Sequence, residues 1–385
     1  MGALPNETDV VIVGAGPVGL TAAGMLAAGG VDFVLLDAQA QGANTSRAAV
    51  VHARTLEALE ALKVSEFLQA RGIELSDFTV HDRGRSLMHI SFKGLPTAYQ
   101  YALMIPQNET EAVLTERLEE LGGSVHRPYK VTGLTQDSQG VTVTATGEDG
   151  TEHTVRARYA IGADGMHSTV RDKVRIGFAG APYAESFVLA DVRMHWPREQ
   201  SVELLLAPEG VTVIAPLPHG RYRVVATVRD APEQPGPADV QALLDERGPG
   251  KDAKVTEVLW SSRFHVHHRL ADRYRAGRVM LAGDAAHVHS PAGGQGMNIG
   301  IQDAVELGRA LAAVVHGEPE TLLDRYEATR RPIAKQVVAF TDRMTKMATM
   351  RNPVQRAARN AALAAIGRVP AVRRNVAMRL AELET

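Results

Sequence analysis

The sequence contains no cysteine among its 385 residues. This absence excludes disulfide bonds, iron–sulfur clusters, cysteine-ligated zinc sites and redox-active dithiols. If the protein transfers electrons, a bound cofactor must therefore carry them.

An excess of charge and uninterrupted hydrophobic runs are also absent. The 42 basic and 44 acidic residues give a net charge of −2, which predicts neither a nucleic-acid nor a membrane partner. Glycines and a proline interrupt the apolar stretch 10–30, so we expect no membrane span. The N-terminus has no basic region of the secretory type, which favours a cytoplasmic location. Residues 343–385 hold nine basic and two acidic residues, which indicates amphipathic helices with a solvated arginine face.

The first 37 residues have the pattern of a nucleotide-binding unit. A β-branched run at 9–13 predicts a buried parallel strand, and a glycine-rich turn follows at 14–19. Small residues at 20–28 predict a helix, and residues 31–36 predict a second strand that ends at Asp37. Strand, turn, helix and strand in this order are typical of a doubly wound α/β sheet.

Each glycine of this turn has a physical reason to be there. Gly14 permits a tight turn, Gly16 lets a diphosphate approach the backbone, and Gly19 lets the helix pack on the strand. The helix N-terminus attracts the diphosphate, and Asp37 can accept hydrogen bonds from ribose hydroxyls. The unit predicts dinucleotide binding without distinguishing FAD from NAD.

Two later segments favour a flavin. Residues 159–168 are a strand that ends in the turn Asp164-Gly165, which by itself is only a turn. Residues 283–298 follow a buried strand and open a helix. Asp284 stands at the carboxyl end of that strand, where open α/β sheets bind ligands. Pro291 stiffens the loop, and its glycines allow a flat ring to lie against the backbone.

The three motifs and their order resemble the single-component (class A) FAD-dependent aromatic hydroxylases, flavoprotein monooxygenases such as p-hydroxybenzoate hydroxylase and phenol hydroxylase. The resemblance covers about residues 9–340 and includes further segments: Ser46-Arg47-Ala48, residues 52–57, Pro106-Gln107, Tyr326-Glu327 and Arg330-Arg331-Pro332.

The resemblance implies a set of FAD contacts. It implies the pyrophosphate at the 14–19 turn, the adenosine ribose at Asp37, and adenine near Val131. It places Arg47, Gln107 and Asp284 along the phosphate–ribityl chain, and Pro291 and 293–298 at the isoalloxazine ring. The implied cofactor-binding residues are Gly14, Ala15, Gly16, Val18, Gly19, Asp37, Arg47, Gln107, Val131, Asp164, Gly165, Asp284, Pro291, Gly293, Gly294, Gln295, Gly296, Met297 and Asn298.

The resemblance also implies the reaction. NADPH or NADH binds transiently, in part at Asp164-Gly165, and reduces FAD; O₂ then gives a flavin C4a-hydroperoxide that hydroxylates an aromatic substrate, phenolic or polyketide-like. Open alternatives are Baeyer–Villiger oxidation or epoxidation of a polycyclic substrate, and a non-catalytic FAD-binding protein. Trp196 and Trp260 are too far apart for the tryptophan motif of flavin halogenases.

The sequence identifies no catalytic base and predicts no metal site. Packing or solvated roles account for each polar candidate in the inserted strands, namely Tyr222, Arg193, Arg221, Arg223 and His195. The run 265–268 places two histidines on one side of a strand, but no acidic ligands accompany them at fitting spacing.

The expected fold is α/β: a Rossmann-like FAD-binding domain of the p-hydroxybenzoate hydroxylase type (GR2), with an inserted, mainly antiparallel β-sheet domain and C-terminal helices. We expect a small aromatic substrate and O₂ as partners, and a monomer or homodimer. The expected divisions are 1–75, 102–178 and 264–320 for FAD, 76–101 and 179–263 for substrate, and 321–385 for the helical segment.

Overall fold

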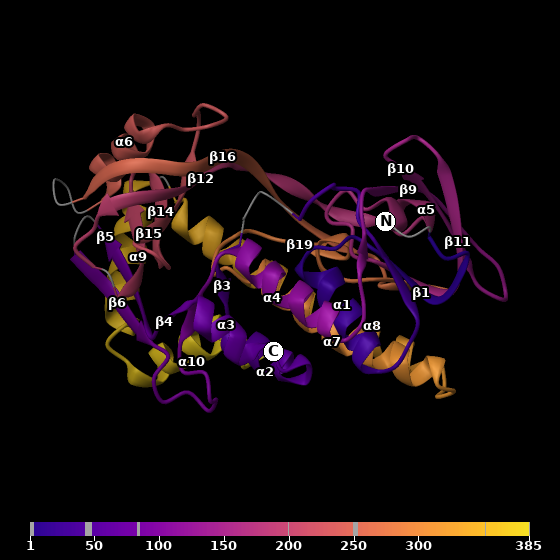
Figure 1. The fold of residues 1–385 in the computed structure, drawn as a ribbon. Coiled ribbons are helices and arrows are strands. Elements are labelled where there is room, and N and C mark those ends of the chain that lie inside the picture. The colour runs from indigo at the N-terminus through magenta and orange to yellow at the C-terminus, as the bar shows by residue number, and fades with distance from the viewer. Residues whose placement is uncertain are drawn as a thin grey trace.

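The computed structural model describes residues 4–42, 48–82, 85–198, 200–248, 253–350 and 352–384. Two large sheets lie at opposite sides of the molecule, and the long strands β12 (Phe178–His195) and β16 (Lys254–Ala271) run between them (Figure 1). Both α/β character and the inserted antiparallel sheet agree with the predicted fold class.

The first sheet has a parallel core that carries the glycine turn. Its order is β17-β18-β11-β1-β2-β8, and neighbouring strands from β18 to β8 are parallel. Val10, Val11 and Ile12 are fully buried, as expected for a strand covered on both faces. The strands are β1 (Glu7–Val13), β2 (Phe33–Leu36), β8 (Val125–His126), β9 (Tyr129–Gln136), β10 (Val141–Gly147), β11 (Glu152–Gly162), β17 (Arg275–Ala276) and β18 (Val279–Leu281).

Two helices of small and apolar residues pack against each other, and the first of them also packs on β1 and β2. They are α1 (Pro17–Ala28) and α7 (Gly296–Val315). A Cβ atom on Gly308 of α7 would lie 2.5 Å from the Cβ of Met25, so only glycine permits this close approach of the helices. The two helices run in the same direction, because Gly300 lies against Val18 and Gly308 against Met25, and both N-termini therefore face the carboxyl edge of the sheet.

The apolar period over 55–70 predicts a helix, and the structure has a broken helical segment there. It forms α2 (Ala53–Leu59), the 3₁₀ turn η1 (Glu60–Leu62) and α3 (Ser65–Arg71). Lys63 adopts a left-handed conformation with φ of 59°, which ends the first helical segment. A third, small sheet consists of β3 (Val50–Val51), β7 (Ala102–Met104) and β4 (Ile73–Leu75). The helix α4 (Gln107–Glu120) follows β7 in the chain.

The second sheet has two covered faces. Helix α6 (Pro237–Arg247) packs on the outer face, where Val240 and Leu244 join the apolar side chains of the strands. On the inner face, Ala215 and Leu217 pack against Ala49 and thus next to β3. The strand order of this sheet is β19-β16-β12-β15-β14-β13-β5-β6, and neighbouring strands are antiparallel except for β13 and β5. The strands not yet given are β5 (Asp77–Asp82), β6 (Arg85–Ser91), β13 (Ser201–Ala207), β14 (Gly210–Leu217), β15 (Arg221–Val228) and β19 (His287–Val288).

The last three helices connect the first sheet with β6 of the second sheet. Helix α8 (Thr321–Ala348) is fastened to the first sheet by Tyr326, whose hydroxyl donates to the Leu281 carbonyl at 2.8 Å. Helices α9 (Pro353–Ile366) and α10 (Pro370–Leu380) then pack on β6, and the chain ends beside α2 (Figure 1). There the Arg54 amide donates to the Ala381 carbonyl at 3.2 Å.

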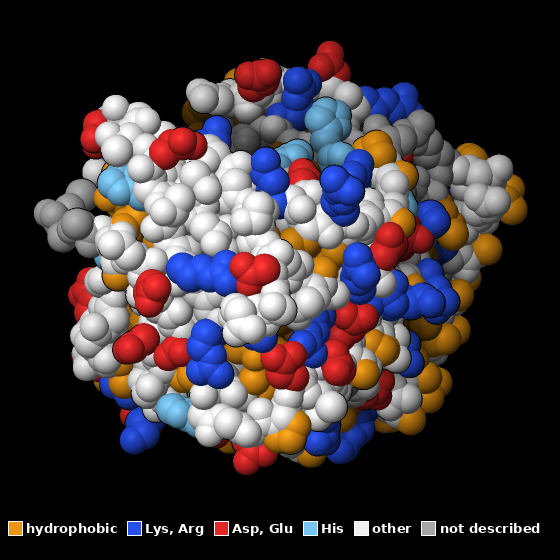
Figure 2. Space-filling view, turned by 90° about the vertical axis from the view of Figure 1, so that its right-hand side faces the viewer, with side chains coloured by type: hydrophobic (Ala, Val, Ile, Leu, Met, Phe, Trp, Pro, Cys, Tyr) orange, Lys and Arg blue, Asp and Glu red, His pale blue; other side chains and the backbone are white. Residues whose placement is uncertain are grey.

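Among the described residues, every helix is too short or too polar to cross a membrane. Basic and acidic side chains intermingle over the face of the molecule that Figure 2 presents.

Candidate cofactor and active site

The three sequence motifs, far apart in the chain, meet at one edge of the first sheet. A Cβ atom on Gly14 would lie 2.4 Å from the carbonyl oxygen of Ala163, next to the Asp164-Gly165 turn. Val18 contacts the third motif, because a Cβ on Gly283 would lie 2.7 Å from its Cγ2. The backbone segments are therefore packed against one another as closely as glycine permits.

Within the first turn, the glycines divide into two kinds. Gly14, with φ of 98°, and Gly19 have no room for a side chain, since a Cβ on Gly19 would lie 1.8 Å from the Gly14 oxygen. A Cβ on Gly16, by contrast, would meet no protein atom within 4 Å. Helix α1 begins directly after Gly16 with Pro17, so its free amides face this open space. The geometry fits a diphosphate seated over Gly16.

Asp37 stands at the carboxyl end of β2 beside this turn. One carboxylate oxygen accepts the Ala15 amide at 2.7 Å, and the other accepts the Gln39 amide at 2.8 Å. Because each carboxylate oxygen can accept two hydrogen bonds, ribose hydroxyls can still bind. The Arg127 guanidinium lies 3.8 Å away and lines a cavity of about 380 Å³ between α1 and α4.

The carboxyl group of Asp164, in the Asp164-Gly165 turn, forms hydrogen bonds to other groups of the protein. Asp164 accepts the Ser168 hydroxyl at 2.5 Å and the Val170 amide at 3.1 Å, at the start of the short helix α5 (Thr169–Lys173). Burial raises the pKa of Asp164, although these hydrogen bonds offset part of the effect. At Gly165, with φ of 78°, a Cβ would meet no atom within 4 Å, so the backbone here is open to a ligand.

The third motif forms a loop that is fixed to the small sheet. The Asn298 side chain accepts the His52 amide at 2.8 Å and donates to the carbonyls of Val50 and Gly294, both at 2.9 Å. Gly294, with φ of 65°, approaches Val50 so closely that a Cβ would lie 2.3 Å from its Cγ1. We call residues 291–298 the flavin loop. Because α7 begins at Gly296, the positive end of its dipole points into this loop.

Two neutral histidines support the flavin loop. The His52 ring donates from Nε2 to the Gly293 carbonyl at 2.8 Å, and the His289 ring donates from Nδ1 to the Ser290 carbonyl at 2.9 Å. Burial lowers the pKa of both residues to about 4, with the backbone hydrogen bonds acting in the opposite direction. Near neutral pH both rings therefore bind their carbonyls without bringing charge to the loop.

This burial predicts acid sensitivity. At pH 5 the unfolded chain protonates His52 while the folded chain does not, so stability falls as the pH drops from 6.5 towards 4. His52→Gln is expected to reduce this slope by about 1.4 kcal/mol per pH unit. Urea unfolding of the apoprotein between pH 4 and 7 measures it, with the exposed His195→Gln as control. Equal slopes for all three proteins would contradict the assignment.

The other residues named from the sequence lie around this edge. Asp284 is exposed on the turn η2 (Gly283–Ala285), directly after β18, and Gln107 opens α4 and accepts the Ala48 amide at 3.2 Å. Val131 is buried in β9, and only its backbone could flank a ligand. Arg47 lies outside the described residues, so its predicted contact stays a prediction.

Sequence reasoning did not identify the buried polar cluster behind the flavin loop. Asp303 on α7 accepts Arg330 Nε at 2.6 Å and contacts His287 Nε2 at 2.6 Å. Burial alone would raise the pKa of Asp303, but Arg330 and His287 together lower it. The sequence analysis named Arg330 only because its segment resembles the hydroxylase family. The polar residues on otherwise apolar helices were the one feature of the sequence that could have indicated a buried cluster.

A second buried ion pair lies within the inserted sheet, and its arginine also bonds to the segment before β3. Arg223 donates through Nε and Nη2 to the Asp191 carboxylate at 2.7 and 2.8 Å, and through Nη1 to the Ala48 carbonyl at 2.8 Å. Among the polar candidates in the inserted strands, Tyr222 is buried in the apolar outer face, whereas Arg223 is on the inner one. Arg223 therefore connects the second sheet to the segment before β3.

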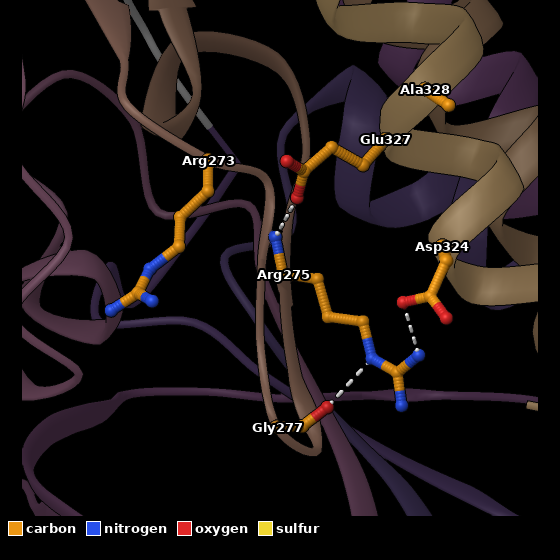
Figure 3. Close-up of a pocket in the computed structure, with 6 residues that line it drawn as sticks. All are labelled: Arg273, Arg275, Gly277, Asp324, Glu327 and Ala328. Atoms are coloured by element: carbon orange, nitrogen blue, oxygen red, sulfur yellow. Dashed lines mark hydrogen bonds and ion pairs between the residues drawn. The ribbon is translucent and has the colours of Figure 1, made fainter. Parts of the chain in front are cut away.

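A cavity of about 510 Å³ lies away from the three motifs, between the β17–β18 turn and α8 (Figure 3). Arg275 there donates to the Gly277 carbonyl at 2.8 Å and to Asp324 at 2.7 Å, and its amide donates to Glu327 at 2.9 Å. These bonds fasten α8 to the sheet. The described residues contain no group of three or more histidine or acidic side chains that could hold a metal ion.

A parallel sheet with a glycine turn at its carboxyl edge, followed by a helix, defines a dinucleotide-binding protein of the doubly wound α/β class. The glycine-rich loop before α7 and the second sheet lie beside this edge. Residues 7–341 match the family described as FAD binding domain. The chain belongs to this family of flavin-dependent monooxygenases, which confirms the predicted family, fold class and FAD cofactor.

Individual relatives act on aromatic compounds. The chain is 39% identical over 349 residues to 12-dehydrotetracycline 5-monooxygenase/anhydrotetracycline 6-monooxygenase of Streptomyces rimosus subsp. rimosus, covering 86% of this chain and 68% of that protein. OxyS anhydrotetracycline hydroxylase from Streptomyces rimosus is 37% identical with a TM-score of 0.83, covering 98% and 76%. The p-nitrophenol 4-monooxygenase PnpA from Pseudomonas putida DLL-E4 is 28% identical with a TM-score of 0.88, covering 97% and 98%.

Proposed function

We propose that this chain uses NADPH or NADH, FAD and O₂ to hydroxylate a phenolic or polyketide-like aromatic ring. The observation that carries the proposal is the convergence of the three motifs: Gly14 against Ala163, and Val18 against Gly283, beside the inner face of a second sheet. Hydroxylases of tetracycline precursors and of p-nitrophenol share this fold, which supports an aromatic substrate.

The proposed FAD contacts follow the open edge of the first sheet. The α1 amides above Gly16 would hold the diphosphate, Asp37 the ribose, and the backbone near Val131 the adenine. Gln107, Arg47 and the exposed Asp284 would bind along the ribityl–phosphate chain. The backbone of the flavin loop would carry the isoalloxazine ring, and the open turn at Gly165 would serve both FAD and the pyridine nucleotide.

Bound FAD would supply hydride acceptance from the pyridine nucleotide and activation of O₂. The residues of this chain would position the cofactor and the substrate and exclude water from them. Asn298 fixes the loop on β3, and the α7 dipole favours negative charge beside Gly296. The inner face of the second sheet would cover the substrate and exclude water, and Arg223 holds that sheet to the loop side of the molecule.

The proposed domain division follows from these roles. Residues 1–75, 102–178 and 264–320 would form the FAD domain, 76–101 and 179–263 the substrate domain, and 321–385 the helical segment. Strand β12 begins at the proposed 178/179 boundary, whereas β16 crosses the proposed 263/264 boundary in its middle and extends to the first sheet's side of the molecule. A monomer or homodimer is proposed, and size-exclusion chromatography with light scattering measures it.

The decisive experiment is anaerobic reduction of the FAD-loaded protein by NADPH or NADH in the presence of a panel of phenols and polycyclic phenols. A substrate is expected to accelerate flavin bleaching by at least about tenfold, and aerobic turnover is expected to add one oxygen atom to the ring carbon. Ring expansion or an epoxide would instead assign the Baeyer–Villiger or epoxidising alternative. A protein that takes up no FAD would contradict the proposal altogether.

A further inference from the structure

Arg127 lies at the carboxyl edge of the first sheet, beside the first glycine turn. Strand β8 pairs in parallel with β2, and its last residue, His126, lies opposite Leu36. The next residue of each strand is Arg127 and Asp37, and their Nη2 and Oδ2 atoms lie 3.8 Å apart. The register of the two strands thus places a cation next to the carboxylate that is proposed to bind the ribose.

The guanidinium of Arg127 also contacts the turn itself. Nη2 donates to the Ala15 carbonyl, in the middle of the turn, at 3.3 Å. A Cβ on Gly42 would lie 3.4 Å from Nη1, so the loop that follows β2 approaches the guanidinium as well. Arg127 therefore lies between the glycine turn and this loop, on the side of the turn where Asp37 stands.

The protein uses little of the hydrogen-bonding capacity of this guanidinium, which has several N–H donors. Among the described residues, the Ala15 carbonyl is the one acceptor within hydrogen-bond distance, and Nε is buried without a partner. The Arg127 side chain is only 20% exposed, so solvent reaches a small part of it. Because buried donors without acceptors are costly, a ligand that supplies acceptor oxygens here would bind favourably.

The charges around the turn favour an anionic group beside Arg127. The N-terminus of α1 supplies about half a positive charge, which is less than the negative charge of a diphosphate. The Asp37 carboxylate adds further negative charge next to the same space. The Arg127 guanidinium offsets both, because it lies beside the turn and beside the carboxylate, and its planar set of donors suits phosphate oxygens.

We propose that Arg127 binds the phosphate on the adenosine side of FAD and makes the site selective for FAD over FMN. The proposal rests on the assignment of the first turn to FAD under the proposed function. Arg127 and Asp37 then recognise adjacent parts of one nucleotide: the guanidinium binds the phosphate, and the carboxylate binds the ribose hydroxyls.

The first test measures the dissociation constants of FAD and FMN for the apoprotein by quenching of flavin fluorescence. Arg127→Gln is expected to bind FAD at least about tenfold more weakly than the wild type and to bind FMN equally well. Arg127→Lys, which keeps the charge but loses the planar donors, is expected to have an intermediate affinity for FAD. Equal FAD affinity of Arg127→Gln and the wild type, or an equal loss for FAD and FMN, would overturn the inference.

The matched control for this test is Arg156→Gln. Arg156 is also on the first sheet, but it lies opposite Glu7 at the other end of β1 and pairs with Asp137 at 2.6 Å. Its replacement is expected to leave the affinities for FAD and FMN unchanged. A loss of FAD affinity as large as that of Arg127→Gln would show that any arginine of this sheet has the same effect, which would overturn the inference.

Modification of arginine side chains by phenylglyoxal gives a second readout that needs no variant. Mass spectrometry of the wild-type apoprotein follows the reaction at each arginine. Saturating ADP or FAD is expected to slow the reaction of Arg127 by at least about tenfold, whereas FMN is expected to leave it unchanged. Arg156 is expected to react at the same rate in every sample.

The two readouts separate failure of the inference from failure of the proposed function. Absence of protection by ADP, or equal protection by FMN, would overturn the inference even if Arg127→Gln fails to fold. A wild type in which ADP protects Arg127 but which takes up no FAD would overturn the proposed function instead, while the contact of Arg127 with a nucleotide phosphate would stand.

Discussion

Replacing Asp303 by alanine is expected to lower the free energy of unfolding by about 3–5 kcal/mol, because the Arg330 guanidinium is then left buried without its partner. Both side chains of the pair are almost entirely inaccessible, and Asp303 also contacts His287. A loss of this size is a large fraction of the stability of a typical domain. Urea unfolding of the apoprotein at pH 7 measures the change.

The control for this prediction is Asp324→Ala. Asp324 also pairs with an arginine, Arg275, but its side chain is 67% exposed. A surface pair of this kind contributes at most about 1 kcal/mol. If the two variants were destabilised equally, the cluster behind the flavin loop would not be the stabilising feature that its burial indicates.

Replacing Gly16 by valine is expected to abolish FAD binding while leaving the apoprotein folded. Because a Cβ on Gly16 would meet no protein atom within 4 Å and its φ is −75°, the fold accepts a side chain there. The added methyl groups would instead occupy the space above the α1 amides, where the diphosphate is proposed to bind. We expect at least about a hundredfold rise in the dissociation constant of FAD, with an unchanged urea midpoint.

Gly19→Ala is the contrasting variant. Its Cβ would lie 1.8 Å from the Gly14 oxygen, so the backbone of the turn must move and the apoprotein itself is expected to be destabilised. The variants at Gly16 and Gly19 thus distinguish a glycine that leaves room for a ligand from one that is required for packing. Retention of FAD by Gly16→Val would show that the diphosphate does not lie over this turn.

The local patterns were sufficient for most of the elements. Residues 9–13 and 20–28 were predicted as strand and helix, and the structure has β1 (Glu7–Val13) and α1 (Pro17–Ala28). The helix predicted over 55–70 is confirmed at both ends but broken in the middle, because the apolar period continues through Lys63 although its backbone turns left-handed. A lysine carries no turn signal of the kind that glycine or asparagine would give, so the break could not be predicted.

The candidate site was predictable where it depends on backbone. Gly14, Gly16, Gly19 and the loop before α7 are recognisable because close approach and positive φ require glycine, whichever side chains surround them. Glu382 and Arg223 were not predictable as buried hydrogen-bonding residues. Their partners, Gln302 and Asp191, are distant in sequence, and a polar residue in an amphipathic segment usually faces solvent.

By itself, the sequence determined the nucleotide-binding unit, the exclusion of cysteine-based redox groups and the order of the three motifs, since glycine spacing and hydrophobic period act over short stretches of chain. Only the tertiary structure decided which buried charges face one another and that Arg379, near the end of α10, bonds to Gln295 of the flavin loop. The physical reason is that desolvation and ion pairing depend on distances between segments that no local pattern encodes.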